Sequence, residues 1–343
     1  MIFAYSPIFF QMFHIVRPSN QLIKLIFRML IVSALLFPSK QVCAEQSTMQ
    51  TQPSDRIETI DAPRDYLSGK FVGLISNIDR FFGGDRNFQE TNDSVFQLYL
   101  TKVSGYTGDR QYVLSGRAKV DLPTTEKRFH LLLETNPEKN VSGEPAQSQA
   151  ELNDQVAAPE SYAAALRFEK ASAGLWHFST DAGVKFKGIT TNPFTRARGS
   201  YSIPIDQWRL KLTETAFWFN DIGAGESTLF EMERLLSEPL LLRSTTNATW
   251  LHEKQNFDLR QDFSIYHTLS DRAALLYQAS AIGISNPQNH VTNYVALVSY
   301  RYRLHREWVY FELTPQIHFP RTENYRSKPM LVMRLEFLLD DSK

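Results

Sequence analysis

Hydrophobic and polar residues alternate one by one through most of the chain, between residues 94 and 339. The clearest example is the stretch 176–187, where Trp176 and Phe178 fall on one side of the alternation and Asp181 on the other. Because successive side chains of a β-strand point to opposite faces, a period of two predicts strands. Each predicted strand has one apolar face and one ionic face.

Fourteen alternating segments can be counted, and most have about ten to thirteen residues, the length that a tilted strand needs to cross a membrane. The segments 226–236 and 94–103 are the least regular, so twelve strands remain the alternative. The predicted strands are 94–103, 112–122, 127–135, 161–169, 175–187, 194–204, 208–219, 226–236, 240–252, 256–267, 273–285, 291–304, 308–319 and 330–339.

The connections between these segments alternate in length. The connection is tight after every even segment, as at 205–207 and 237–239, whereas after odd segments it varies from 253–255 to the long insert 136–160. Short turns at one end and freer loops at the other are typical of outer-membrane barrels. The predicted fold is therefore all-β, a transmembrane antiparallel up-and-down barrel over 94–339.

Tryptophan placement favours the same fold. The five tryptophans lie near the predicted strand ends, on the apolar side of the alternation or beside it. Amphipathic rings at both ends of membrane-crossing strands form an aromatic girdle. The predicted girdle residues are Trp176, Trp208, Trp218, Trp250 and Trp308.

A secreted soluble β-sandwich or barrel is the structural rival, because the alternation alone does not say which face is outside. The length and regular spacing of the strands weigh against it. In addition, the segment 331–337 resembles the C-terminal assembly signal of Gram-negative outer-membrane barrels, although residues 338–343 trail beyond it. That resemblance implies the barrel assembly machinery as a partner.

The N-terminal part of the chain has a different character. Residues 1–44 contain basic residues, no Asp or Glu, and a short apolar stretch before Ala44, which predicts a cleaved signal peptide and export. Residues 45–93 form a predicted periplasmic leader in which 67–82 has helical spacing and ends at Gly83-Gly84. We expect this amphipathic helix to pack on the barrel, to plug it, or to lie in the membrane interface.

Charge and cysteine content exclude several classes of protein. The chain has 37 Lys and Arg against 37 Asp and Glu, which gives no indication of a nucleic-acid partner. Its single cysteine, Cys43, lies in the predicted signal peptide, so the exported chain has no disulfide. Stability must come from hydrogen bonds and packing, which suits a closed sheet.

Few residues suggest chemistry. The eight histidines are dispersed without metal-ligand spacing and no phosphate-binding glycine loop occurs, so neither a metal nor a cofactor is expected. His177-x-Ser179 resembles the His-x-Ser of outer-membrane lipid acyl hydrolases, but both residues lie on the ionic side of the alternation, away from lipid. We therefore expect the protein not to be an enzyme.

The ionic sides of the strands carry the candidate functional residues. Charged side chains cannot face acyl chains, where a mid-depth Arg or Lys costs roughly 2–4 kcal/mol, so we expect them to line the barrel interior. The predicted pore-lining residues are Arg117, Lys119, Arg128, Arg167, Asp181, Lys185, Arg196, Arg198, Arg209, Lys211, Glu231, Glu233, Arg243, Arg260, Asp262, Arg301, Arg303, Glu312, Arg334 and Glu336.

Two functions follow from this interior. A hydrated lumen predicts a passive channel or solute-binding pore for small polar solutes, with a mild preference for anions. A lumen closed by ion pairs predicts a non-conducting structural or surface-interaction barrel. A lipid acyl hydrolase, suggested by His177-x-Ser179, is a third and less favoured alternative. The expected location is the Gram-negative outer membrane, with its lipid and lipopolysaccharide as surroundings.

Two short motifs carry a resemblance to a known group. The element Ile78-Asp-Arg-Phe-Phe-Gly83, with Leu122-Pro-Thr-Thr-Glu-Lys-Arg128 at the first tight turn, resembles a family of uncharacterised proteobacterial outer-membrane β-barrel proteins. The resemblance implies a barrel and an outer-membrane location, and it implies no activity.

Overall fold

The computed structural model describes residues 77–82, 88–89, 94–105, 110–122, 128–141, 161–171, 175–205, 207–286, 289–305 and 308–340. The predicted signal peptide 1–44 lies outside the described residues, as do most of the predicted leader and the Gly83-Gly84 helix end.

Fourteen strands form one closed antiparallel barrel, as the alternation predicts, and the twelve-strand alternative is wrong. The strands are β1 Val95–Ser104, β2 Arg110–Asp121, β3 Phe129–Thr135, β4 Tyr162–Ala171, β5 Trp176–Lys187, β6 Thr190–Ile205, β7 Trp208–Phe219, β8 Gly223–Ser237, β9 Leu240–Leu251, β10 Asn256–Ser270, β11 Ala273–Ile284, β12 His290–His305, β13 Val309–Pro320 and β14 Lys328–Asp340. Short 3-10 turns are η2 Pro137–Val141 and η4 Arg321–Glu323.

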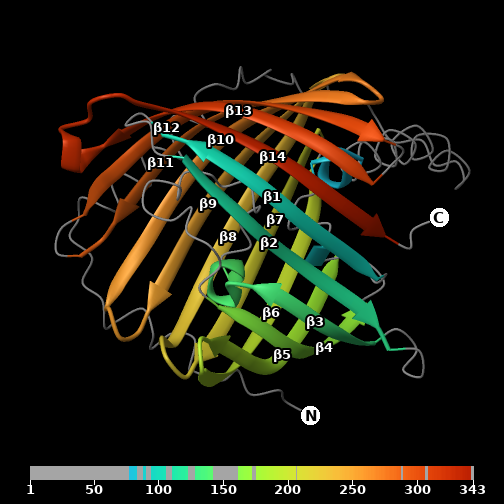
Figure 1. Ribbon diagram of the computed structural model, residues 1–343, viewed down its shortest axis with the longest axis vertical. Coiled ribbons are helices and arrows are strands. Elements are labelled where there is room, and N and C mark those ends of the chain that lie inside the picture. Colours follow the sequence, from blue (N-terminus) through green and yellow to red (C-terminus); the bar gives the residue numbers. More distant parts are fainter. Residues whose placement is uncertain are drawn as a thin grey trace, which may run out of the picture. The chain divides into compact units, whose positions relative to one another are not determined.

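The barrel closes by pairing of its first and last strands. β1 and β14 run antiparallel in register from Val95 opposite Asp340 to Ser104 opposite Leu331, and all other strands pair with their neighbours in sequence (Figure 1). A closed sheet leaves no unpaired edge. Because the strand number is even, β1 begins and β14 ends at the same end of the barrel. We call it the terminal end, and the opposite end the loop end.

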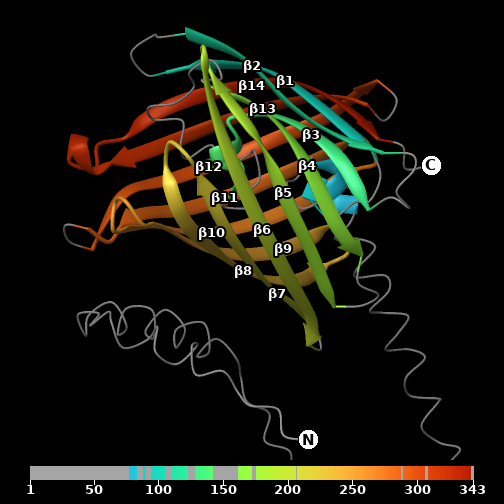
Figure 2. The ribbon, with the colours of Figure 1, turned by 90° about the horizontal axis from the view of Figure 1, so that it is seen from below.

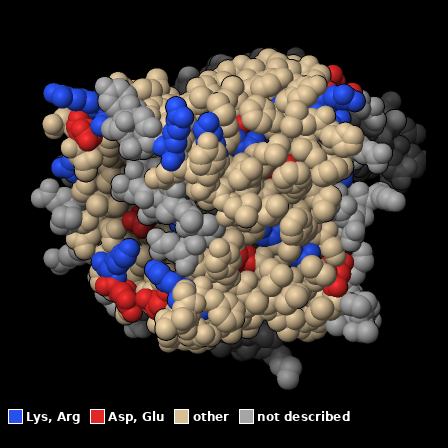
Figure 3. All heavy atoms as spheres, in the orientation of Figure 1, with Lys and Arg blue, Asp and Glu red and all other residues tan. Residues whose placement is uncertain are grey.

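The outer and inner walls differ in polarity. On β7, Leu212 and Trp218 are exposed on the outside, whereas Lys211, Thr213 and Thr215 are buried on the inside. The other strands repeat this distribution, and uncharged side chains cover most of the face turned to the viewer in Figure 3. A soluble sandwich, with an apolar core and an ionic surface, is therefore excluded.

Residues 77–81 are helical, and they are the described part of the predicted helix 67–82. In both ribbon views this short blue helix lies within the ring of strands, near the end of β14 (Figures 1 and 2). Among the described residues, no helix is long and apolar enough to span a membrane.

Close contact between β4 and β5 requires a glycine at position 183. A Cβ at Gly183 would lie 2.4 Å from the Ala164 carbonyl oxygen and 2.5 Å from the Ala165 Cβ, whereas one at Gly199 would meet nothing within 4 Å. We expect Gly183→Ala to lower the free energy of unfolding by about 1–3 kcal/mol. Urea unfolding of the detergent-refolded protein, followed by tryptophan fluorescence, measures this, and Gly199→Ala is the matched control with little expected change.

Candidate functional site

The candidate site is the inner wall of the barrel, where the structure places nearly all the residues predicted to line a pore. Arg209 and Arg303 are partly exposed, and Arg128 lies outside the strands, directly before β3, and is exposed. The other seventeen are buried: Arg117, Lys119, Arg167, Asp181, Lys185, Arg196, Arg198, Lys211, Glu231, Glu233, Arg243, Arg260, Asp262, Arg301, Glu312, Arg334 and Glu336.

Asp181 on β5 is the centre of an ion-pair network on β3 to β6. Arg167 donates to both oxygens of the Asp181 carboxylate, at 2.6 Å from Nε and 2.9 Å from Nη2. Arg196 donates from Nε to the same carboxylate at 3.0 Å, and its Nη2 donates to Glu134 at 2.6 Å. Each of these four side chains is at most 5% exposed, so mutual pairing compensates their loss of hydration.

The network continues toward the terminal end. Glu169 on β4 accepts a hydrogen bond from Arg167 Nη1 at 3.4 Å and pairs with Lys119 Nζ on β2 at 3.3 Å. His130 Nδ1, fully buried, lies 2.7 Å from Asp121 Oδ1. The inner wall of β2 to β6 is therefore joined by charge-assisted hydrogen bonds, some between neighbouring strands and some, such as Lys119 to Glu169, across an intervening strand.

A second network lies on β7 to β9. Glu233 accepts from Arg243 Nε at 2.6 Å and from Arg209 Nε at 2.8 Å, one to each carboxylate oxygen. The Arg243 guanidinium also lies 4.9 Å from the centre of the Tyr266 ring, within the range of a cation–π contact.

A third network joins β12, β13 and β14. Arg301, fully buried, pairs with Glu336 at 2.6 Å and with Glu312 at 3.3 Å, and Arg334 lies 3.9 Å from Glu312. The Arg301 guanidinium lies 4.4 Å from the centre of the Tyr310 ring. This network therefore compensates the charges on the side of the barrel where the sheet closes.

The helix at 77–81 packs against the inner wall. Ile78 and the adjoining Phe82 are buried in a cluster with Leu241, Tyr266, Ala274, Leu276 and Leu297, which point inward from β9 to β12. Phe82 meets the Tyr266 ring edge-on at 5.1 Å between centroids, and Asp79 accepts from Arg243 Nη2 at 2.5 Å. Of the three positions expected for this helix, its described part therefore occupies the lumen.

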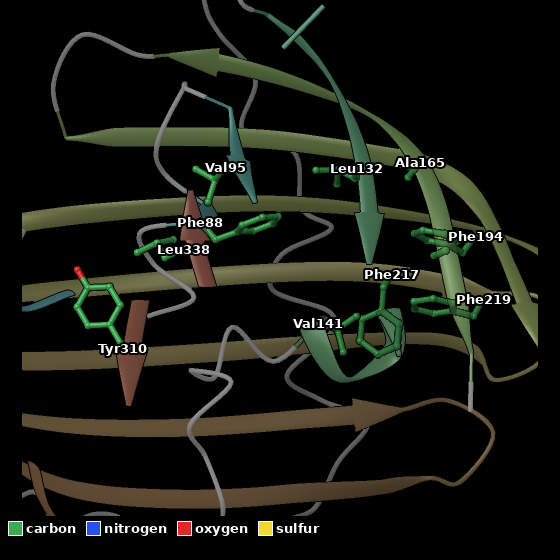
Figure 4. Close-up of a cluster of buried hydrophobic side chains, with 11 residues drawn as sticks. Phe88, Val95, Leu132, Val141, Ala165, Phe194, Phe217, Phe219, Tyr310 and Leu338 are labelled. Atoms are coloured by element: carbon green, nitrogen blue, oxygen red, sulfur yellow. The ribbon is translucent and has the colours of Figure 1, made fainter. Parts of the chain in front are cut away.

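The following described residues reach a different part of the wall. Phe88 is 1% exposed, and its ring lies 4.3 Å from the Arg117 guanidinium on β2. Phe88 clusters with Val95 at the start of β1 and Leu338 near the end of β14 (Figure 4). Residues 78–82 and Phe88 thus contact inner-wall residues on several sides of the barrel.

The turn η2, which follows β3 at the loop end, also folds into the lumen (Figure 2). Its Pro137 and Asn140 carbonyl oxygens accept from Arg196 Nη1 at 3.1 Å and from Arg198 Nη2 at 2.8 Å. Val141 packs beside Phe217, near the stacked rings of Phe194 and Phe219 (Figure 4). The rest of the predicted insert, 142–160, lies outside the described residues.

The expectation of an ionic inner wall is incomplete, because apolar side chains also point inward. Many of them lie where an inward segment contacts the wall: Leu241, Tyr266 and Leu276 meet the helix, and Phe217 clusters with η2. Val103 and Val332 instead cluster with other strand residues at the loop end. The signal that could have found them was an apolar residue on the otherwise ionic side of a strand. Such a residue indicates an internal packing partner.

The tryptophans lie at strand ends, facing outward. Trp176 and Trp208 begin β5 and β7, Trp308 directly precedes β13, and Trp218 and Trp250 are each next to last in β7 and β9. They occupy both the terminal end and the loop end of the barrel. This placement suits an aromatic girdle with one ring at each end of the barrel, and the girdle stays a prediction.

The residues His177 and Ser179 belong to the inner wall of β5. Ser179 is 2% exposed and has the same inward parity as His177. A nucleophile in this position cannot meet lipid at the outer wall. Within the described segments, no three His, Cys, Asp or Glu side chains are grouped so that they could hold a metal ion.

Comparison with known proteins adds similarities of fold. No family model and no curated protein matches the chain. Among solved structures, it is similar to Pseudomonas putida OprB (TM-score 0.46, 8% identity, 75% of this chain and 97% of that chain). It is also similar to the outer-membrane channel DcaP of Acinetobacter baumannii (TM-score 0.43, 7% identity, 72% and 96%). With TM-scores below 0.5, these similarities assign no function, and the family resemblance stays an expectation.

Removing the Asp181 charge tests the first network. We expect Asp181→Asn to lower the free energy of unfolding by about 3–5 kcal/mol, because it leaves two buried guanidinium groups without their shared carboxylate. The pair Glu323–Lys328, 3.4 Å apart with an exposed carboxylate and a partly exposed ammonium group, supplies the control, since Glu323→Gln should cost at most about 1 kcal/mol. Equal urea midpoints for the two variants would contradict the assigned role of Asp181.

Proposed function

We propose that this protein is an outer-membrane β-barrel that acts as a passive channel or solute-binding pore for small polar solutes. The observation that carries the proposal is the polarity of the two walls, apolar outside and charged inside. A closed barrel satisfies its backbone hydrogen bonds internally, which a hydrocarbon environment requires. In a soluble protein the same outer wall would expose large apolar side chains from nearly every strand to water.

The proposed surroundings of the barrel follow from the same distribution of apolar and charged side chains between its two walls. An outer wall of this kind takes lipid as its partner, with lipopolysaccharide at the loop end and the barrel assembly machinery during insertion. Export by a cleaved signal peptide at 1–44 belongs to the same proposal. No nucleic acid, metal or cofactor enters it, and no side chain has a catalytic role.

The interior charge biases which solutes pass. The buried charged side chains on the described strands comprise eleven Lys or Arg and eight Asp or Glu, a difference of 11 − 8 = 3 positive charges. Most of these charges are paired, so the preference for anions is mild. Arg196 and Arg198 donate to carbonyl oxygens of η2, so these two positive charges hold η2 inside the ring of strands.

A non-conducting structural barrel is the second candidate. Residues 77–82 and η2 occupy part of the lumen, and many inner charges are almost fully buried. If these segments stay in place, the barrel transmits little, and its outer surface and loops supply its function.

Planar-bilayer recording separates the two candidates. We expect refolded protein to give stable single-channel steps in potassium chloride and, under a salt gradient, a reversal potential that favours chloride slightly. Silence from a correctly folded, heat-modifiable barrel would support the non-conducting candidate. A marked preference for cations would contradict the assigned effect of the inner charges.

The helix at 77–81 should restrict conduction. We expect the double variant Asp79→Asn, Phe82→Ala to raise the mean conductance, because it removes the ion pair with Arg243 and the ring contact with Tyr266. Asn77→Ala is the matched control, since Asn77 is exposed on the same helix. Unchanged conductance in the double variant would show that the helix does not obstruct the path.

A further inference from the structure

A group of polar and small side chains interrupts the apolar outer wall on β6 to β10. All of its members have outward parity on their strands. We call this group the outer polar patch, and its residues are Gly199, Glu214, Thr228, Ser244, Thr246 and Gln261.

Hydrogen bonds join the patch in two places. The Thr228 hydroxyl donates to the Glu214 carboxylate at 2.8 Å, between directly opposed residues of β7 and β8. Thr246 donates to the Gln261 carbonyl oxygen at 2.6 Å, and the Gln261 amide donates to Ser244 at 3.0 Å. The carboxylate keeps acceptor capacity, and the Ser244 hydroxyl, which accepts from Gln261, still has its own proton to donate.

The patch lies inside the apolar band and not at its margin. Trp208 and Trp218 begin and nearly end β7 on the outward side, and Glu214 lies between them. Glu214 lies four positions before Trp218, which is about 13 Å along the strand. Hydrocarbon at this depth offers neither a donor to a carboxylate nor a partner to a hydroxyl.

Elsewhere the outer wall between the strand ends is apolar on the described strands, apart from Thr180 on β5, which adjoins β6. Exposed outward residues there include Leu100 on β1, Leu133 on β3, Leu166 on β4, Val298 on β12 and Ile317 on β13. The outer polar patch is therefore confined to one side of the barrel. A feature restricted to one side indicates a specific neighbour and not the surrounding lipid.

The shape of the patch suits close approach. Gly199 lies directly opposite Glu214 in the register of β6 and β7, and a Cβ at Gly199 would meet nothing within 4 Å. Ala197 and Ala216 are paired on the same outward face next to it. Together these residues leave a shallow region beside the carboxylate.

We propose that the outer polar patch is the contact surface for a second copy of this chain, related by a two-fold axis along the membrane normal. The patch contains both acceptors and donors, so two copies that face each other through it can satisfy one another's polar groups. A second copy also presents this patch at the same depth in the same membrane. The inference rests on the proposed membrane placement, and it holds whether or not the lumen conducts.

Cysteine cross-linking in lipid vesicles tests the contact. The exported chain has no cysteine if cleavage follows Ala44, so Thr246→Cys introduces the one thiol. After mild oxidation we expect a disulfide-linked dimer in a yield several times that of Leu166→Cys, the outward-facing control on β4. Equal yields, or no dimer from Thr246→Cys, would overturn the proposal.

A second variant excludes a loss of folding as the cause. Gly199→Trp places a large ring in the open space beside Glu214, where its Cβ meets no atom of its own chain. Combined with Thr246→Cys, it should abolish the cross-link while heat-modifiable migration persists. Ala182→Trp, outward on β5, should leave the cross-link intact.

Further measurements distinguish a failure of the dimer proposal from a failure of the proposed membrane placement. Light scattering should give twice the mass of one chain for the wild type in mild detergent and a single mass for Gly199→Trp. A monomeric wild type that conducts would overturn the dimer and leave the channel standing. A cross-link in native membranes to a different protein would also overturn it, and solubility without detergent would overturn both proposals.

Discussion

The interior of this barrel depends on the pairing of charged side chains between strands, both adjacent and farther apart in the sheet. Each strand presents one face outward and one inward, so a charged residue on the inward side of the alternation points into the lumen. Once there, it is buried by its neighbours and keeps its charge at acceptable cost only if a partner lies within hydrogen-bond distance. Asp181 between Arg167 and Arg196, and Glu233 between Arg209 and Arg243, meet this requirement with carboxylates shared by two arginines.

The shared carboxylates also connect parts of the wall that the backbone joins only in pairs. Backbone hydrogen bonds link each strand to two neighbours, whereas the Arg301 side chain on β12 reaches both Glu312 on β13 and Glu336 on β14. Such a bridge spans the two strands that precede closure onto β1. The ionic interior therefore supports the same closed sheet that keeps lipid away from it.

Two segments that are not strands pack against the inner wall of the barrel. The helix at 77–81 has both an ionic contact, Asp79 with Arg243, and apolar contacts, among them Phe82 with Tyr266. The turn η2 likewise accepts from Arg196 and Arg198 while Val141 packs beside Phe217. The inner wall therefore combines apolar side chains and hydrogen-bonding charges where each inward segment packs.

The sequence by itself determined where the strands lie and which residues of each strand share a face, because a period of two is a local property of each segment. It left twelve strands and a soluble barrel as alternatives, and the closed sheet of fourteen strands with its charged face inside decided between them. The inward position of Arg167 or Glu312 could be predicted in the same way, from parity within one strand. Only the tertiary structure decided which charges pair and what occupies the lumen. Asp79 and Arg243 are 164 residues apart, and a contact between two such positions leaves no periodic trace along the chain. The physical reason is that alternation records which solvent a side chain faces, whereas the identity of its neighbour depends on how the whole sheet closes.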